Sequence, residues 1–285
     1  MSTIPPPSIS AGPTIQLGPL ASEKALGQRA DFNPDKYDNL IEWHGLRLGW
    51  SRAAVCPCTP TNGQTDQADP SCDICQGAGY LYFNAPEAQD PSLIGDLTAV
   101  QRKVLRQGAA SVVRGLMTGM GTSETPFERL GRLPAGSAIV TVRANNRLGH
   151  LDRLVNLDAY IVHTEKVELV DPDLRLPLRY LVDGGVNVLA STERRFVPDD
   201  DFVVVDGDVM WQPGRAPMPG TFLTAHYNYH PQYLVTEQPH ATRLTYTPTG
   251  ARGQATPQGR VTQFPLQAMV RLDWMVGEDT QGVLP

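Results

Sequence analysis

Residues 201–235 read DFVVVDGDVMWQPGRAPMPGTFLTAHYNYHPQYLV. Valine, phenylalanine, tyrosine and threonine, which are enriched in strands, fill the runs on both sides of Asp206-Gly207-Asp208. An Asp-Gly pair between two such runs is typical of a tight β-hairpin turn. The Pro- and Gly-rich stretch at 213–220 then separates this hairpin from a strand of alternating aromatic residues. The segment therefore predicts consecutive antiparallel strands.

Short runs of the same kind recur from residue 133 onwards, divided by Gly, Pro, Asp and Asn at the spacing of a β-sandwich or barrel. They include GSAIVTVRANN (136–146), DAYIVHTEKVELV (158–170) and RYLVDGGVNVL (179–189). The composition agrees, because 26 glycines and 25 prolines among 285 residues imply many turns. We therefore predict a mainly β chain with one or more sandwich-like or barrel-like β domains.

The chain divides into three predicted parts. Residues 1–32 are rich in proline and glycine and are predicted to form an extended N-terminal arm, with a disordered tail as the alternative. Residues 33–90 form a small metal-binding module, which opens with a helix from Pro34 to Trp43, capped by Asn33, and continues with a strand over 44–56. Residues 91–285 form the β-rich part, with a subdomain break near 170. Between 91 and 130 the pattern fits either a helix or strands, and we favour strands.

All four cysteines of the chain lie close together, as CPC at 56–58 and CDIC at 72–75. Two pairs of thiolates on tight turns can enclose a tetrahedral ion, and zinc is the usual ion for such a set. The N-terminus lacks the charged and apolar regions of a signal peptide, so we expect synthesis in the reducing cytoplasm, where metal binding is favoured over disulfides. The sequence predicts one Zn²⁺ bound by Cys56, Cys58, Cys72 and Cys75.

Four sulfur ligands close the coordination shell, so the predicted zinc is structural, and His44 is not needed as a ligand. Two disulfides or four free thiols are the alternatives. The loop between the pairs, TPTNGQTDQADPS (59–71), offers no core-forming residues, so the ion would supply its folding energy. Gly77 and Gly79 let the backbone turn its amides toward sulfur. The second pair resembles one half-site, CxxCxGxG, of the cysteine-rich region of DnaJ-type chaperones, but a single copy does not make a chaperone.

Other residues with chemical potential are better explained as structural. Asp199-Asp200-Asp201 lacks the ligand spacing of a calcium loop and fits a solvated turn. His226 and His230 could share one face of a strand, but surface or packing roles are commoner. The cations of RKVLRQ (102–107) fit a solvated helix or strand face, and the four tryptophans fit the core or subunit contacts. No phosphate-binding glycine loop, GxSxG or HExxH motif occurs.

Three stretches are similar to structural proteins of tailed bacteriophages with neck, head-to-tail connector or tail roles. The first runs from His44-Gly45 to Trp50 and on through CPC and DPSCDICQGAGYLY (69–82). The second is the hairpin segment 201–235, and the third is LQAMVRLDWM (266–275). The resemblance spans most of residues 40–275 loosely. It implies a virion component that assembles as a ring and has no catalytic activity.

Further expectations follow from this resemblance. The partners would be further copies of the chain and other phage structural proteins, such as the portal or connector, the tail terminator, and the sheath or tube. The net charge of −6 disfavours tight phosphate binding, so genomic DNA could pass without sticking. A baseplate, tail or capsid-decoration protein is the alternative, and a zinc-ribbon nucleic-acid-binding protein a weaker one. No run is long and apolar enough for a membrane span.

Overall fold

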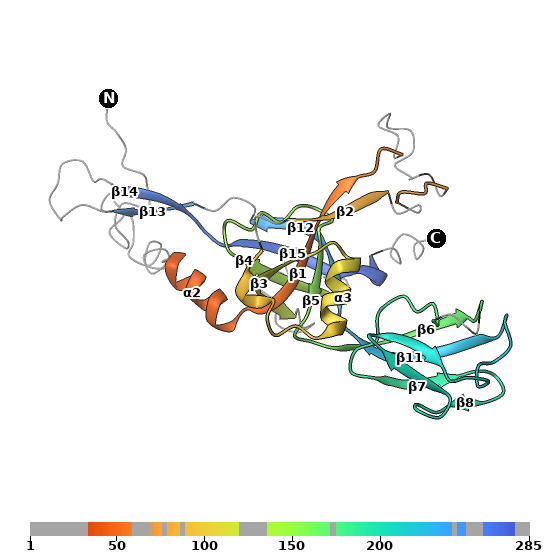
Figure 1. Cartoon of the computed structure of the whole chain (residues 1–285). Helices are drawn as coiled ribbons and strands as arrows, with labels where there is room; N and C mark the ends of the chain where they lie inside the picture. Colours follow the sequence, from red (N-terminus) through yellow and green to blue (C-terminus); the bar gives the residue numbers. More distant parts are fainter. Residues whose placement is uncertain are drawn as a thin grey trace, which may run out of the picture.

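The computed structural model describes residues 34–58, 69, 71–75, 79–85, 89–119, 136–171, 175–240, 244–248 and 259–276. Its centre is an antiparallel barrel, from which a helix, two β-hairpins and a second β module extend (Figure 1). The prediction of a mainly β chain is confirmed. The arm predicted for residues 1–32, the cap at Asn33 and most of the loop at 59–71 lie outside the described residues.

Six described strands close the barrel in the order β1-β3-β4-β15-β12-β5, with β5 pairing back onto β1. Every neighbouring pair is antiparallel. Trp50 faces Ser111 on one neighbouring strand and Leu154 on the other, so β1 is held from both sides. The strands are β1 (Leu46–Val55), β3 (Ser111–Gly119), β4 (Ser137–Val142), β5 (Arg153–Asn156), β12 (Gln232–His240) and β15 (Leu266–Leu272).

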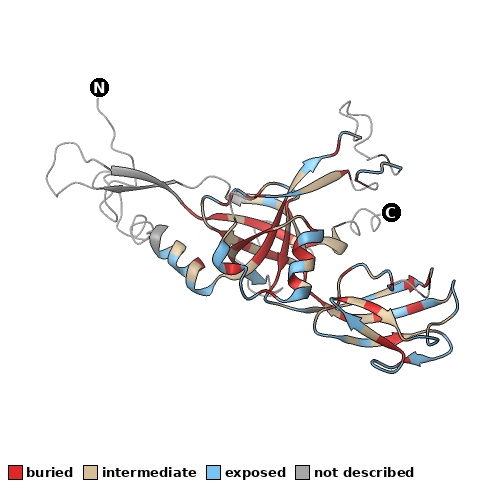
Figure 2. Ribbon diagram, viewed as in Figure 1, coloured by how far each residue is buried: buried red, intermediate tan, exposed pale blue. Residues whose placement is uncertain are grey.

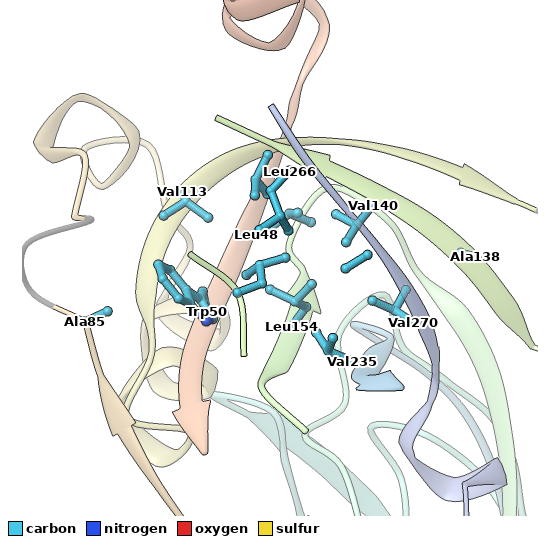
Figure 3. Packing of buried hydrophobic residues seen from close by; sticks show 13 residues of the cluster. Leu48, Trp50, Ala85, Val113, Ala138, Val140, Leu154, Val235, Leu266 and Val270 are labelled. Atoms are coloured by element: carbon cyan, nitrogen blue, oxygen red, sulfur yellow. The ribbon is translucent and has the colours of Figure 1, made fainter. Parts of the chain in front are cut away.

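Alternating side chains fill the barrel interior. Along β4 every second residue is buried, as expected for a strand with one face toward a core. Figure 3 shows these side chains meeting inside the barrel, where Trp50 is fully buried, and Figure 2 shows buried residues concentrated on the barrel strands. The core cluster comprises Leu48, Trp50, Ala85, Val113, Ala138, Val140, Val142, Leu148, Leu154, Val235, Leu266, Ala268 and Val270. The barrel is therefore a packed core and not a channel.

Beyond Ser51, β1 leaves the barrel and pairs only with β2 (Tyr80–Asn84), from Ser51 opposite Asn84 to Val55 opposite Tyr80. This two-stranded ribbon projects away from the barrel (Figure 1). A second hairpin, β13 (Leu244–Pro248) with β14 (Gly259–Gln263), lies between β12 and β15 in the chain. The strand predicted to lead into the first cysteines is confirmed as β1.

A second β module is inserted between β5 and β12. Its sheet has the order β6-β11-β7-β8, and a hairpin of β9 and β10 packs with it around a separate apolar core. Asp206 and Gly207 form the two-residue turn with φ values of 48° and 84°, which confirms the predicted hairpin. The elements are β6 (Ile161–Glu168), β7 (Val186–Ala190), β8 (Arg195–Phe196), β9 (Phe202–Val205), β10 (Asp208–Trp211) and β11 (Phe222–Tyr229).

The predicted N-terminal helix is confirmed as α2 (Pro34–His44), which packs on the barrel through the buried Ile41. The short 3-10 helices are η3 (Pro91–Leu93) and η5 (Asp273–Met275). The barrel takes strands from both sides of residue 91, since β1 precedes this residue and the other five barrel strands follow it. The predicted domain boundaries at 33, 91 and near 170 stay predictions.

The preference for strands over 91–130 is wrong for residues 99–107, which form helix α3 (Ala99–Gln107). Thr98 and Gln101 make a capping box: each side chain accepts a hydrogen bond from the other residue's backbone N–H. The Gln101 amide also donates to the Leu157 carbonyl at 2.8 Å, which anchors the helix to the barrel. Residues 111–119 are a strand, as expected, and residues 120–135 lie outside the described part.

Candidate metal centre

The β1–β2 ribbon places both cysteine pairs at its outer end. Cys56 directly follows the last residue of β1, and Cys72 and Cys75 precede β2. The Cys56 amide donates to the Gly79 carbonyl at 2.8 Å, which continues the antiparallel ladder one step past Val55 and Tyr80. The strand register therefore brings two cysteine pairs, 14 to 19 positions apart in the chain, into one cluster.

The four Sγ atoms lie within 4.8 Å of one another, so the structure brings all four predicted ligands together. The Sγ atoms of Cys56 and Cys72 are 3.9 Å apart, and those of Cys58 and Cys75 are 3.4 Å apart. A disulfide needs about 2.05 Å, and the cysteines are free. A tetrahedral Zn²⁺ with bonds of about 2.3 Å sets its sulfurs about 3.8 Å apart, which is the scale of this cluster.

Local turns point backbone amides at the sulfurs. The amides of Cys58, Asp69 and Gly79 hydrogen-bond the thiols of Cys56, Cys58 and Cys75 respectively, and each such bond favours the thiolate. Gly79 has a φ of 77°, a conformation that glycine adopts without strain. This confirms the predicted role of Gly79, whereas Gly77 lies outside the described residues.

Asp69 forms the entry to the second pair. Its Oδ1 accepts hydrogen bonds from the Ser71 backbone N–H at 2.9 Å and from the Ser71 hydroxyl at 2.7 Å. Its carbonyl accepts from the Cys72 amide at 3.1 Å, so the turn delivers Cys72 toward the cluster. These hydrogen bonds, first the one from the Ser71 side chain, lower the pKa of the Asp69 carboxyl. The sequence spacing did not reveal this role of Asp69.

The thiols of Cys56, Cys58 and Cys75 have shifted pKa values. Burial raises the pKa of Cys58 to about 12, with the neighbouring thiols adding to the effect. For Cys75 burial also acts upward, but the Gly79 amide and the other thiols outweigh it and lower the pKa to about 7. The Cys58 amide favours the Cys56 thiolate, yet burial and the thiols of Cys75 and Cys72 raise the pKa of Cys56. A bound dication would compensate the charge of four thiolates, which is the chemistry of a closed structural site.

In the part of the chain that the structure describes, this cluster is the one group of three or more Cys, His, Asp or Glu side chains close enough to hold a metal ion. His226 and His230 have other partners. His226 Nδ1 lies 2.6 Å from the Thr164 hydroxyl, and the buried His230 lies between the Ala159 carbonyl at 3.1 Å and Asp183 at 2.9 Å. Both ring nitrogens of His230 are engaged, so the side chain links the segment at Ala159 to the segment at Asp183.

The aspartates at 199–201 differ in part from the solvated turn predicted for them. Asp199 and Asp200 are exposed, but Asp201 is buried and its carboxylate accepts from the Val197 backbone N–H at 2.9 Å. Arg194 pairs with the same carboxylate at 3.3 Å.

The tryptophans were predicted to lie in the core or in subunit contacts, and their burial differs. Trp50 is in the barrel core, whereas Trp43 on α2 is 80% exposed.

No helix among the described residues combines the length and the apolar character that a membrane crossing requires. A scan against models of known protein families found no match, and a search of curated proteins found no similar sequence. The geometry of the four cysteines is thus the firmest functional finding: a thiol cluster suited to a metal ion, with zinc the best fit.

Proposed function

We propose that this chain is a non-catalytic structural subunit of a tailed-phage virion, which assembles as a homo-oligomeric ring at the neck or head-to-tail connector. The virion assignment is motivated by the loose resemblance of residues 44–82, 201–235 and 266–275 to structural proteins of tailed phages. The structural observation that supports a subunit of an assembly is the exposure of large apolar side chains on the elements that project from the barrel.

Two projecting elements carry these side chains. Trp43 and Leu40 lie exposed on α2, and Val55 and Ile74 lie exposed at the cysteine end of the ribbon, where Ile74 is 70% exposed. Figure 2 shows exposed residues on both elements, on opposite sides of the barrel. Large apolar side chains gathered at projecting ends are costly in water and typically mark protein contacts. In a ring each would be buried against a neighbouring subunit.

The zinc ion has a mechanical role in this proposal. Cys56, Cys58, Cys72 and Cys75 would hold Zn²⁺ and so fix the end of a two-stranded ribbon, which is marginally stable without support. The cation provides the charge that lets four thiolates share one site. The ribbon end can then keep one shape through assembly.

The filled barrel bears on the path of DNA. Because apolar side chains occupy its interior, DNA would pass through the hole of the ring and not through a subunit. The net charge of −6 supports a lumen wall that repels phosphates. A lumen lined mainly by Lys and Arg would contradict this part of the proposal. The further partners would be the portal or connector on one side and the tail terminator, tube or sheath on the other.

An averaged cryo-EM map of the particle that contains this chain, with metal analysis of the same sample, tests the proposal. The expected result is a closed ring between head and tail, with density amid the four sulfurs. Location in the baseplate, tail or capsid surface would favour the alternative structural roles and overturn the neck assignment. A monomer whose metal has an open coordination position would overturn the structural role as a whole.

A further inference from the structure

We propose that the cysteine-clamped turn of one copy inserts Ile74, with Asp73 beside it, into an arginine-edged cleft next to α3 of a second copy. The inference rests on the self-assembly in the proposed function and names the surfaces that would form the contact. It joins two features: the exposed Ile74, for which the proposed function names no partner surface, and a concave apolar site beside α3.

The cleft lies between α3, the segment around Ile94 and the β9–β10 turn. It encloses about 550 Å³. Its apolar lining includes Ile94, Leu97, Leu105 and Val112, of which Leu97 and Val112 are almost completely buried as residues. A concave apolar site edged by a few charged groups is the usual form of a binding pocket.

Cations dominate the edge of the cleft. Arg102 and Arg106 are exposed and one helical turn apart on α3, so they lie on one face of the helix. Lys103 also lines the cleft but already pairs with Asp208. Asp206 is the one carboxylate among the described lining residues. The charge therefore favours an occupant that combines an apolar side chain with a carboxylate.

The cysteine-clamped turn, residues 71–75, offers this combination. Ile74 is 70% exposed although it lies between two ligands of the cluster, and Asp73 beside it is also exposed. Cys72 and the buried Cys75 bracket the pair, so a bound ion fixes its backbone on both sides. A side chain such as Ile74, whose backbone is fixed before binding, loses little conformational entropy when it binds. Ile74 would fill the apolar floor, and Asp73 would face the two arginines.

The turn and the cleft of one chain do not meet. In Figure 1 the ribbon carries its cysteine end away from α3, so the partner of each surface is another copy. A contact between two different surfaces is heterologous, and such a contact closes into a ring when the rotation between subunits permits. The proposed contact therefore has the symmetry type that a ring requires.

Photo-crosslinking tests the contact directly. Full-length, zinc-loaded protein carries a photo-crosslinking amino acid at position 74 and is mixed with isotopically labelled wild type before irradiation. The expected product joins position 74 of one isotopic form to the peptide that contains residues 94–112 of the other. Crosslinks to a different surface, such as the end of β6 near Val170, or a chain that stays monomeric at every concentration, would overturn the inference.

Charge and size variants give a second test. Ile74→Asp and Arg106→Glu should each weaken self-association by roughly tenfold or more, measured by analytical ultracentrifugation. Val170→Asp is the matched control, because Val170 is 73% exposed on another surface. Each variant must retain its zinc and its circular dichroism. The pair Asp73→Arg with Arg106→Glu should recover part of the loss, and no recovery would contradict a direct charge contact.

The cryo-EM experiment separates this inference from the proposed function. A neck ring whose subunits meet through other surfaces would leave the function standing and overturn this contact. If the chain lies outside the neck but its copies meet through Ile74 and the cleft, this contact stands and the neck assignment is overturned.

Discussion

The indole Nε1 of Trp50 donates a hydrogen bond of 2.8 Å to Oδ2 of Asp152 inside the barrel wall. Both residues are buried. The same carboxylate accepts from the backbone N–H of Gly149 at 2.6 Å and from that of Ala53 at 2.9 Å. Ala53 lies where β1 has left the barrel and pairs only with β2, so Asp152 fastens the base of the ribbon to the barrel.

Asp152→Ala should therefore destabilise the protein strongly. The substitution leaves three buried or half-buried N–H donors without their acceptor, and each lost partner costs about 1–3 kcal/mol. We expect the free energy of unfolding to fall by about 3 kcal/mol or more, measured by urea denaturation. Asp200→Ala, at an exposed aspartate, is the control and should stay within about 0.5 kcal/mol of wild type. Equal effects of the two substitutions would show that Asp152 does not support the fold.

Cys72→Ser should abolish tight zinc binding and produce aggregated or wrongly assembled protein. The barrel core contains none of the cysteines, so the circular dichroism of the strands should persist while the ribbon end is lost. Zinc content by mass spectrometry and the absorption of the Co²⁺-substituted protein report the site. Ser71→Ala changes the neighbouring residue but keeps all four thiols, and should bind one ion. Assembly and stability like those of wild type in Cys72→Ser would contradict a structural metal.

The strands that sequence predicted best are those with strict alternation. In β11, from Phe222 to Tyr229, every second residue is buried, and the sequence alternates accordingly. The metal centre could also be predicted from the sequence, because the close spacing of the cysteines already limits the geometry of a shared ion. Local chemistry was enough in both cases.

The closure of the barrel could not be predicted from the sequence in this way. The four-residue strand β5 joins β1 to β12, and its partners lie about a hundred residues before it and about eighty after it. No local pattern encodes such a pairing. Helix α3 had a readable signal, the capping box of Thr98 and Gln101, but its valines also suited a strand. The cleft beside this helix could not be anticipated once a strand was expected there.

Gly45 is required by close packing at the end of α2. A Cβ on this residue would lie 2.2 Å from the carbonyl oxygen of Ile41, which also accepts the Gly45 N–H at 2.8 Å. Because the neighbour is backbone, it cannot turn aside as a side chain could. Gly45→Ala should lower the free energy of unfolding by about 1–3 kcal/mol, measured by urea denaturation.

Gly119 provides the matched control for this substitution. It ends β3, and nothing among the described residues lies within 4 Å of the position that a Cβ would take there. Gly119→Ala should be neutral, or stabilising by about 0.5–1 kcal/mol through reduced entropy of the unfolded chain. A loss of stability in Gly119→Ala as large as in Gly45→Ala would refute the packing explanation.

His163 lies half-buried among aromatic rings at the junction of β6 with η5. Its ring centroid is 5.2 Å from that of Tyr180, 5.6 Å from that of Tyr229 and 5.6 Å from that of Trp274. Burial lowers the pKa of His163 below its ordinary 6.5, against the opposite effect of the Glu165 and Asp273 carboxylates, while Arg179 acts with burial. The folded state therefore holds its proton less tightly than the unfolded state does.

The stability contributed by His163 should be complete above about pH 6.5 and decline as the pH falls, because the unfolded chain takes up the proton first. His163→Phe keeps an aromatic ring and should flatten the decline in the free energy of unfolding between about pH 6.5 and 5, measured by urea denaturation. Burial raises the pKa of Asp273, which gives an opposite slope at lower pH, so the difference between wild type and variant isolates the histidine. His150→Phe, at an exposed histidine, is the control and should keep the wild-type dependence of stability on pH. If His163→Phe also kept the wild-type dependence, the aromatic cluster would not control this proton.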